Sequence, residues 1–276
     1  MFPNQAYVAA SLSALAIRGR LIASLLVLGA ISSVPFLSFP AAEAQPVERS
    51  PIPQGTVLPA RLDGGLSLKD ARREQVIQAK TTQEVPLPSG SIPYKSTLTG
   101  AIMGIEHDTN GPGLRLTLKF HQLEYRNQSV RILTYLRAIA SLRAVRNAQL
   151  PLAGPDAGTP SGWADTVQIG GDIRYGDGGL VRNRAKQKVG TGVRGGVLVQ
   201  LHANPALGCD GSLNGEEAPQ ALWVFSSDAC GVYDLRGVKI TQTGKAPPEG
   251  YITLHFDKDD MKLESGTGML LRIVPD

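Results

Sequence analysis

The segment Leu114-Arg115-Leu116-Thr117-Leu118-Lys119-Phe120 has the most regular hydropathy pattern in this chain of 276 residues. Apolar residues occupy every second position, and arginine, threonine and lysine lie between them. A period of two residues places the apolar side chains on one face of a β-strand and the polar side chains on the other. We therefore predict an antiparallel strand here, with one face on a hydrophobic core and the other in solvent.

Extended segments of the same kind recur on both sides of this strand, separated by glycine and proline turns. The 31 glycines and 19 prolines exceed the average share of these residues, which favours a turn-rich β-architecture over a helix bundle. Besides the strand at 114–120, we predict strands at residues 56–62, 75–82, 92–105, 130–133, 167–175, 195–202, 221–226, 238–243, 251–256 and 268–274.

Residues 134–149, TYLRAIASLRAVRNAQ, interrupt the series of strands with alanine, leucine and arginine, which are strong helix formers. Leu136, Ile139, Leu142 and Val145 recur every three residues. This spacing predicts one short amphipathic helix.

A segment rich in proline and glycine, residues 151–165, follows this helix and has no hydrophobic period. The fold class that we predict is mainly β, with two antiparallel sandwich-like or barrel-like lobes and one short helix between them. The expected organisation is a signal peptide at 1–44, a linker at 45–54, a β-lobe ending in the helix at 55–150, a linker at 151–165 and a second β-lobe at 166–276.

The N-terminal segment has the order of features of a secretory signal peptide. Arg18 and Arg20 precede an apolar run at 21–39, and Ala42 and Ala44 form an A-x-A cleavage signal. We expect an exported protein, periplasmic or extracellular, that meets a membrane only through this segment before cleavage. An uncleaved anchor is the alternative, because the apolar run is nearly long enough to span a bilayer.

The chain has two cysteines, Cys209 and Cys230. An isolated pair in an oxidising compartment predicts a structural disulfide. Closing a loop of this length contributes on the order of 3 kcal/mol to stability in the chain-entropy description. Redox-active pairs usually have C-x-x-C spacing, which is absent here.

The net charge of +4 is mildly basic, and the densest basic stretch, residues 182–188, contains no aromatic residue. Nucleic-acid binding requires a concentrated basic face with aromatic residues among the cations. We therefore predict a solvated loop at 182–188 and no nucleic-acid partner.

The opening Gly55-Thr56-Val57-Leu58-Pro59-Ala60-Arg61-Leu62, followed by Pro88-Ser89-Gly90-Ser91, resembles the entry strand and turn of the TrbI-like β-barrel domain of conjugal-transfer channel proteins. This resemblance implies an alternative function, as a component of an envelope-spanning transfer or secretion apparatus that assembles into a ring.

The second half is similar to a group of uncharacterised exported bacterial proteins that carry the stretch QALWVFSSDACGVY, residues 220–233. The resemblance implies residence in the envelope or outside the cell, and it implies no particular activity.

Motifs for catalysis are absent, and we predict no catalytic residue. The four histidines have no metal-ligand spacing, and no G-x-S-x-G elbow occurs. A hydrolase with a site around His202, Asp210 and Asp228 is an alternative, since Ser226 and Ser227 precede Asp228. Serine and aspartate are also common turn residues, and the prediction favours that role.

A calcium loop is the one metal site that the sequence indicates. Asp210, Ser212 and Asn214 stand at loop positions one, three and five, and Glu216 follows a glycine at position six. The twelfth position holds Ala221 instead of the bidentate glutamate of an EF-hand. We predict no cofactor, with a weak calcium site as the alternative.

Four aromatic residues are candidates for a recognition surface: Trp163, Trp223, Phe225 and Tyr233. Trp223 and Phe225 share one face of the predicted strand 221–226, a pattern that also fits a core. The function that we expect is an exported, non-catalytic binding or structural module of the bacterial cell envelope or exterior, with an envelope or extracellular ligand that the sequence does not identify.

Overall fold

The computed structural model describes residues 52–109, 111–152, 164–176, 178–212, 218–241 and 250–274. The predicted signal peptide with Ala42 and Ala44, and most of both predicted linkers, lie outside these ranges. The chain divides into the units 1–46 and 47–276, and every described residue belongs to the second unit. Among the described residues, no helix has the length and apolarity needed to cross a bilayer.

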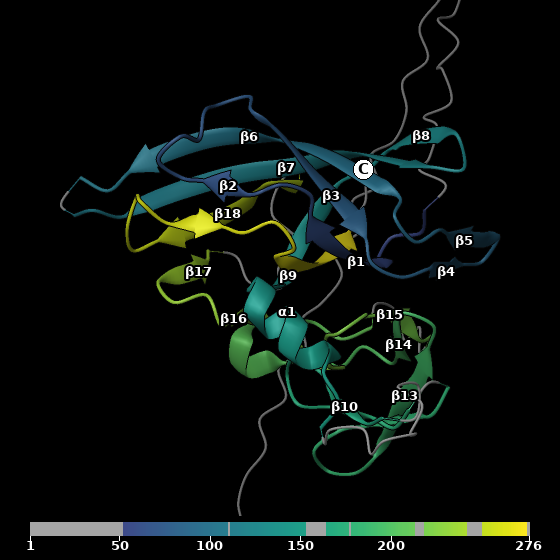
Figure 1. The fold of residues 1–276 in the computed structure, drawn as a ribbon. Helices are drawn as coiled ribbons and strands as arrows, with labels where there is room; N and C mark the ends of the chain where they lie inside the picture. Colours follow the sequence, from purple (N-terminus) through teal and green to yellow (C-terminus); the bar gives the residue numbers. More distant parts are fainter. Residues whose placement is uncertain are drawn as a thin grey trace, which may run out of the picture. The chain divides into compact units, whose positions relative to one another are not determined.

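The fold is mainly β, as predicted, and a ten-stranded sheet is its main element (Figure 1). The strand order is β16-β9-β20-β1-β3-β6-β7-β18-β17, with β8 paired to β7 outside this path. The strands of this large sheet are β1 (Val57–Leu62), β3 (Val76–Thr81), β6 (Thr97–His107), β7 (Leu114–Tyr125), β8 (Gln128–Arg131), β9 (Thr134–Ala140), β16 (Gly231–Tyr233), β17 (Val238–Ile240), β18 (Ile252–Phe256) and β20 (Gly268–Ile273).

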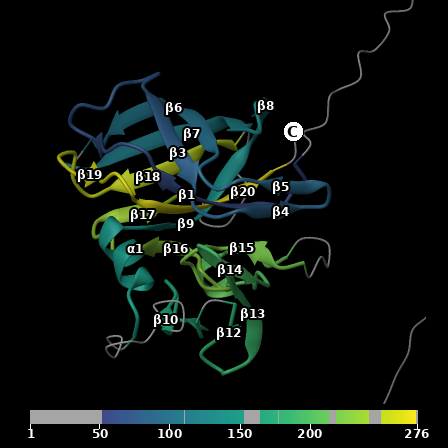
Figure 2. The same cartoon turned by 45° about the vertical axis from the view of Figure 1, so that its right-hand side comes forward.

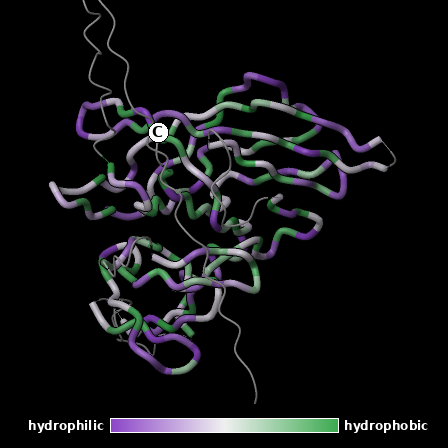
Figure 3. Tube along the Cα trace, turned by 180° about the vertical axis from the view of Figure 1, so that it is seen from behind, coloured by the Kyte–Doolittle hydropathy of each residue, from purple (hydrophilic) through white to green (hydrophobic). Residues whose placement is uncertain are grey.

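The large sheet curls around a first hydrophobic core. Its two end strands, β16 and β17, are consecutive in the chain and contact each other, so the two edges of the sheet meet. The predicted apolar face of β7 points into this core, where Leu114, Leu116, Leu118 and Phe120 are all buried. A void of about 10 Å³ lies in this core, at the lower limit of the space that one water needs. Hydrophobic and hydrophilic residues alternate along the long strands in Figure 3.

A smaller, six-stranded antiparallel sheet is built from consecutive strands. They are β10 (Thr166–Val167), β11 (Ile173–Arg174), β12 (Leu180–Arg182), β13 (Lys188–Val193), β14 (Gly196–Val199) and β15 (Gln220–Ala221). Two short pairs complete the described strands, β2 (Leu66–Ser67) with β19 (Lys262–Leu263), and β4 (Val85–Leu87) with β5 (Gly90–Ile92).

A second hydrophobic core joins the small sheet to the outer face of the large one (Figure 2). Val57 of β1, Ala138 of β9 and Leu270 of β20 contribute to this core together with Val197 and Val199 of β14. Helix α1 (Leu142–Gln149) adds two residues to the same core. Strands β9 and β20 are therefore covered on both faces, and all of their residues are buried.

The expected second lobe, 166–276, is corrected by this topology. Only 166–221 form the small sheet, and β16, β17, β18 and β20 return to the large sheet. Strand β20 lies between β1 and β9 and pairs with both, so the backbone groups of these two central strands are satisfied only when the end of the chain is in place. The segment 151–165 therefore precedes the small sheet, but residues on both sides of it contribute to the large sheet and to both cores.

The predicted helix 134–149 is also corrected, because only its second half is helical. Residues Thr134–Ala140 form β9, which pairs with β20 and β16. Backbone pairing on both edges and burial on both faces outweigh the helix propensity of these residues. Helix α1 starts after Ser141, whose hydroxyl accepts a hydrogen bond from the Ala144 N–H at 3.0 Å.

Other boundaries differ more locally. The predicted strand 92–105 is divided between β5 and β6, the strand 167–175 is divided between β10 and β11, and the strand 221–226 ends at Ala221. The basic stretch 182–188 is the turn between β12 and β13, two strands that the sequence analysis missed.

One side chain joins the helix start to the turn between β16 and β17. Asp234 accepts hydrogen bonds from Ser141 Oγ at 2.5 Å and Arg143 Nε at 2.8 Å. Two hydrogen bonds lower the pKa of Asp234 to about 2, and the bond from Arg143 has a larger effect than the bond from Ser141. The carboxylate form is thus favoured by the folded state.

We predict that Asp234→Asn lowers the free energy of unfolding near pH 6 and has little effect near pH 2. The native pKa lies below the unfolded value of about 3.9, so the stabilisation is present above about pH 4 and is lost as the pH falls toward 2. Urea unfolding at both pH values measures the difference. Asp259→Asn, at an exposed acid, is the control, and an equal effect of both substitutions would contradict the prediction.

Candidate functional site

A cleft of about 620 Å³ lies beside the base of the β4–β5 hairpin. Arg61 of β1, Arg126 after β7 and Arg194 between β13 and β14 line it, together with the aromatic side chains of Tyr94 and Trp223. We call this feature the arginine cleft. Its lining comes from both sheets, so the cleft exists only because the small sheet is packed on the large one.

The arginine cleft continues into a second hollow of about 390 Å³. The two hollows share Arg61, Gln149 and Trp223, and the second adds Arg146 of helix α1. We call the two neighbouring hollows together the groove; both border Trp223, and their lining includes four arginines and the acids Glu84 and Asp63.

The groove carries an excess of positive charge. In the described ranges, the side chains of Arg61, Arg146 and Arg194 have neither a hydrogen bond nor an ion pair, and all three residues are exposed. Arg126 donates a hydrogen bond to Ser91 Oγ at 3.1 Å, and Ser91 in turn donates to Glu84. Unpaired cations along a concave surface raise the local concentration of anions.

Trp223 is held at the floor of the groove by a buried glutamine. Gln83 Oε1 accepts hydrogen bonds from the N–H groups of Trp223 at 2.5 Å and Val197 at 3.3 Å, and its Nε2 donates to the Val197 carbonyl at 3.0 Å. Gln83 follows β3 of the large sheet, whereas Val197 lies on β14 of the small sheet. This one side chain therefore ties the two sheets together at the cleft.

Trp223 has a φ of 56°, a left-handed conformation that costs a residue with a side chain of order 1–2 kcal/mol. This conformation ends the predicted strand 221–226, because the chain turns back with a Phe225 N–H bond to the Leu222 carbonyl at 2.9 Å. Its ring lies over Gly268 of β20, where a Cβ would come within 3.3 Å of the ring. Strain of this kind is typical of functional sites.

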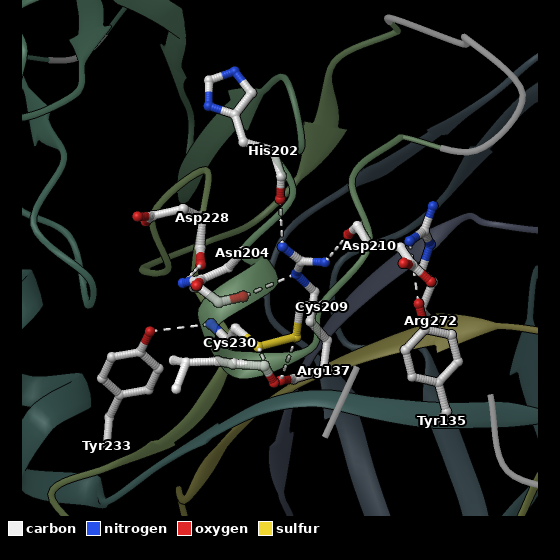
Figure 4. The surroundings of a disulfide bond; sticks show 12 residues. Tyr135, Arg137, His202, Asn204, Cys209, Asp210, Asp228, Cys230, Tyr233 and Arg272 are labelled. Atoms are coloured by element: carbon white, nitrogen blue, oxygen red, sulfur yellow. Dashed lines mark hydrogen bonds between the residues drawn. A yellow bond between two sulfur atoms is a disulfide. The ribbon is translucent and has the colours of Figure 1, made fainter. Parts of the chain in front are cut away.

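The predicted disulfide between Cys209 and Cys230 is confirmed, with a Cα–Cα distance of 6.1 Å. Both cysteines are buried beside Arg137 of β9 (Figure 4). The backbone near both ends of the loop that the disulfide closes, together with that of His202 before the loop, contacts the guanidinium group of this arginine.

Arg137 is an extra residue in its strand. Ala138 pairs with Leu270 and Leu136 pairs with Leu271, so Arg137 has no partner on β20 and forms a β-bulge. The bulge directs its side chain toward the disulfide loop. Nε donates to the Ala229 carbonyl at 2.8 Å, Nη2 to the His202 carbonyl at 2.6 Å and Nη1 to the Asp210 carbonyl.

Burial lowers the pKa of Arg137 to about 10. The group is therefore still a cation at neutral pH, although its side chain is fully buried. Three backbone carbonyls, rather than a carboxylate, compensate the charge: Asp210 and Ala229 belong to the disulfide loop, and His202 lies before it. Arg137 thus orders the loop that the disulfide closes.

The residues of the alternative hydrolase site contribute mainly to turns. Ser226 Oγ donates to Asp228 Oδ1 at 2.8 Å, and Ser226 is fully buried beneath Gly170. The hydrogen bonds of His202 are made by its backbone. Its N–H donates to the Ser227 carbonyl at 2.9 Å, and its carbonyl accepts a hydrogen bond from Arg137. Among the described residues, no serine hydroxyl is hydrogen-bonded to the His202 imidazole.

A buried carboxylate, Asp172, lies next to this group. Its Oδ2 accepts the Ser227 N–H at 2.7 Å, and burial raises its pKa. The acid orders the turn after β15.

Of the described aromatic candidates, Trp223 borders the groove, but it is only 6% exposed and belongs to the second hydrophobic core. Phe225 is fully buried and meets the Tyr233 ring edge-on, with 6.5 Å between ring centroids. Tyr233 Oη accepts the Cys230 N–H at 3.0 Å, and burial raises the pKa of Tyr233. Trp163 lies outside the described residues.

The calcium loop is described only in part, because Asn214 and Glu216 lie outside the described ranges. Asp210 gives its carbonyl to Arg137, and Ser212 Oγ donates to the Leu201 carbonyl at 3.2 Å. In the described part of the chain, no three His, Cys, Asp or Glu residues are grouped as metal ligands. The calcium site stays a prediction.

We predict that Gly196→Ala destabilises the protein by about 2 kcal/mol, because a Cβ there would overlap Gln83 Oε1 and approach the Trp223 backbone. Gln83→Ala alone also destabilises, since it leaves buried N–H groups without an acceptor. The double variant should cost less than the sum of both. Denaturant unfolding measures all three. Gly111→Ala, where a Cβ meets nothing within 4 Å, is the control, and additive losses would contradict the proposed contact.

We predict that Arg137→Met lowers the free energy of unfolding by about 3 kcal/mol, because three buried carbonyls lose their donor. The matched control is Arg115→Met, at an exposed arginine of β7 paired with Glu106, where the change should stay below about 1 kcal/mol. Urea unfolding with the disulfide intact provides the measurement. Equal losses of unfolding free energy in both variants would show that the three hydrogen bonds from Arg137 to backbone carbonyls contribute little to stability.

No family model, no curated protein and no solved structure matches this chain. The resemblances to TrbI-like domains and to exported bacterial proteins therefore stay predictions.

Proposed function

We propose that this chain is a non-catalytic binding module of the bacterial cell envelope or exterior, and that its ligand is an acidic oligosaccharide held in the arginine cleft. The observation that carries the proposal is the row of exposed guanidinium groups beside Trp223, with few acids to neutralise them.

The chemistry of the groove favours an acidic ligand with rings. Guanidinium groups form paired, charge-assisted hydrogen bonds with carboxylates and sulfates, and they stay protonated at any physiological pH. Tyr94 is 52% exposed at the rim and offers the apolar ring face that a sugar ring can cover. A polymer with an acid on successive rings matches cations that are spread along a groove.

Two features support the location. The N-terminal segment has the charge, the apolar run and the small residues of a signal peptide. The disulfide is typical of proteins that fold outside the reducing cytosol.

We predict that the disulfide-bonded protein binds a hexamer of galacturonic acid and does not measurably bind the neutral galactose hexamer. Arg61→Ser with Arg194→Ser should weaken binding by at least about tenfold, because each substitution removes a charge-assisted contact. Titration calorimetry at low and moderate salt is the measurement, and affinity should fall as salt rises.

Arg115→Ser, outside the groove, is the matched control and should bind as the parent protein does. Equal affinity for the acidic and the neutral hexamer, or unchanged binding by the double variant, would refute the arginine cleft as the site.

A further inference from the structure

A second cleft, of about 440 Å³, lies where the start of β1, the tip of the β4–β5 hairpin and the small sheet meet. Its walls are mainly apolar, with Pro53, Pro86, Leu87 and Leu198 among them. One cation, Arg272 of β20, lines it. We call this feature the Arg272 cleft.

Arg272 differs from the arginines of the first groove because it is only 1% exposed. Its Nε donates to the Gly55 carbonyl at 3.3 Å, and its Nη1 donates to Tyr135 Oη at 3.1 Å. Both acceptors are neutral. In the described part of the chain, no carboxylate lies within ion-pair distance of this guanidinium, and none of its hydrogen bonds there uses Nη2.

A second buried cation increases the need for a counter-charge. Arg137 lies on the neighbouring strand, two residues from Tyr135, which is the register partner of Arg272. The two like charges repel each other, and in addition to burial the charge of Arg272 contributes to the lowered pKa of Arg137. A buried charge is costly unless an opposite charge or several hydrogen bonds compensate it. Arg137 has three carbonyls, whereas Arg272 has two neutral acceptors and lines the cleft.

We propose that the Arg272 cleft binds a small organic anion with one carboxylate and an apolar body. The guanidinium of Arg272 takes the carboxylate, and the proline and leucine walls take the apolar part. The cleft has a volume in the usual range for small-molecule sites, with apolar walls and few polar groups, as such sites commonly have. One buried cation calls for one negative charge, in contrast to the several exposed cations of the arginine cleft.

The test uses octanoate as the probe, with octanol as the neutral analogue, and titrates both into the disulfide-bonded protein. We expect octanoate to bind at least tenfold more tightly than octanol. Arg272→Gln should remove this preference, and Leu87→Ser, in a wall, should weaken binding of both compounds. Arg194→Ser should leave octanoate binding unchanged, which separates this proposal from that for the arginine cleft.

Equal binding of octanoate and octanol, or no saturable binding of octanoate, overturns the proposal. So does an Arg272→Gln variant that folds and still prefers octanoate. If that variant does not fold, two other results test the proposal. They are the preference of the parent protein for octanoate over octanol and the weaker binding of both compounds by Leu87→Ser. An apolar tripeptide that binds more tightly than octanoate, and loses this binding when its C-terminal carboxylate is amidated, would also overturn the proposal. The ligand would then be the C-terminus of a peptide rather than a small organic anion.

Discussion

The arrangement of both sheets depends on the β-bulge at Arg137. Strand β9 pairs with β20 and β16 and is buried on both faces, so a charged side chain in its regular alternation would point into one of two apolar cores. The extra residue changes the alternation, so Leu136 and Ile139 face the first core while Arg137 reaches two carbonyls of the disulfide loop and that of His202 before it. A buried cation can remain in a central strand only because that loop surrounds it.

The disulfide and Arg137 act on the same segment in complementary ways. Sulfur links Cys209 to Cys230 and limits the conformations of the unfolded loop. The guanidinium group then selects one folded conformation, because its three donors require three carbonyls at defined positions. Where the loop ends, β16 continues into the large sheet, so its order is transmitted to the edge at which that sheet closes.

Local sequence patterns predicted the secondary structure correctly where the residues of a segment determine its conformation. They failed where contacts with residues distant in the sequence determine it. The alternation at Leu114–Phe120 was sufficient, since one face of β7 meets the core. Strand β9 looks helical in sequence, and its pairing with β20 is not visible locally. Tryptophan is common in strands, but the Trp223 N–H lies in a turn and donates a hydrogen bond to Gln83, 140 residues away. Of the arginine cleft, sequence analysis found Trp223 alone, because its arginines come from separate elements.

The two clefts share the β4–β5 hairpin but differ in how water reaches their cations. The base of the hairpin borders the arginine cleft, and its tip borders the Arg272 cleft. Exposed guanidinium groups are screened by water and salt, so a single contact there contributes little and affinity requires several charges on one ligand. Arg272 is shielded from water, so one carboxylate gains more from it, provided that an apolar body excludes water from the contact. The difference in burial is therefore sufficient to give neighbouring sites different ligand classes.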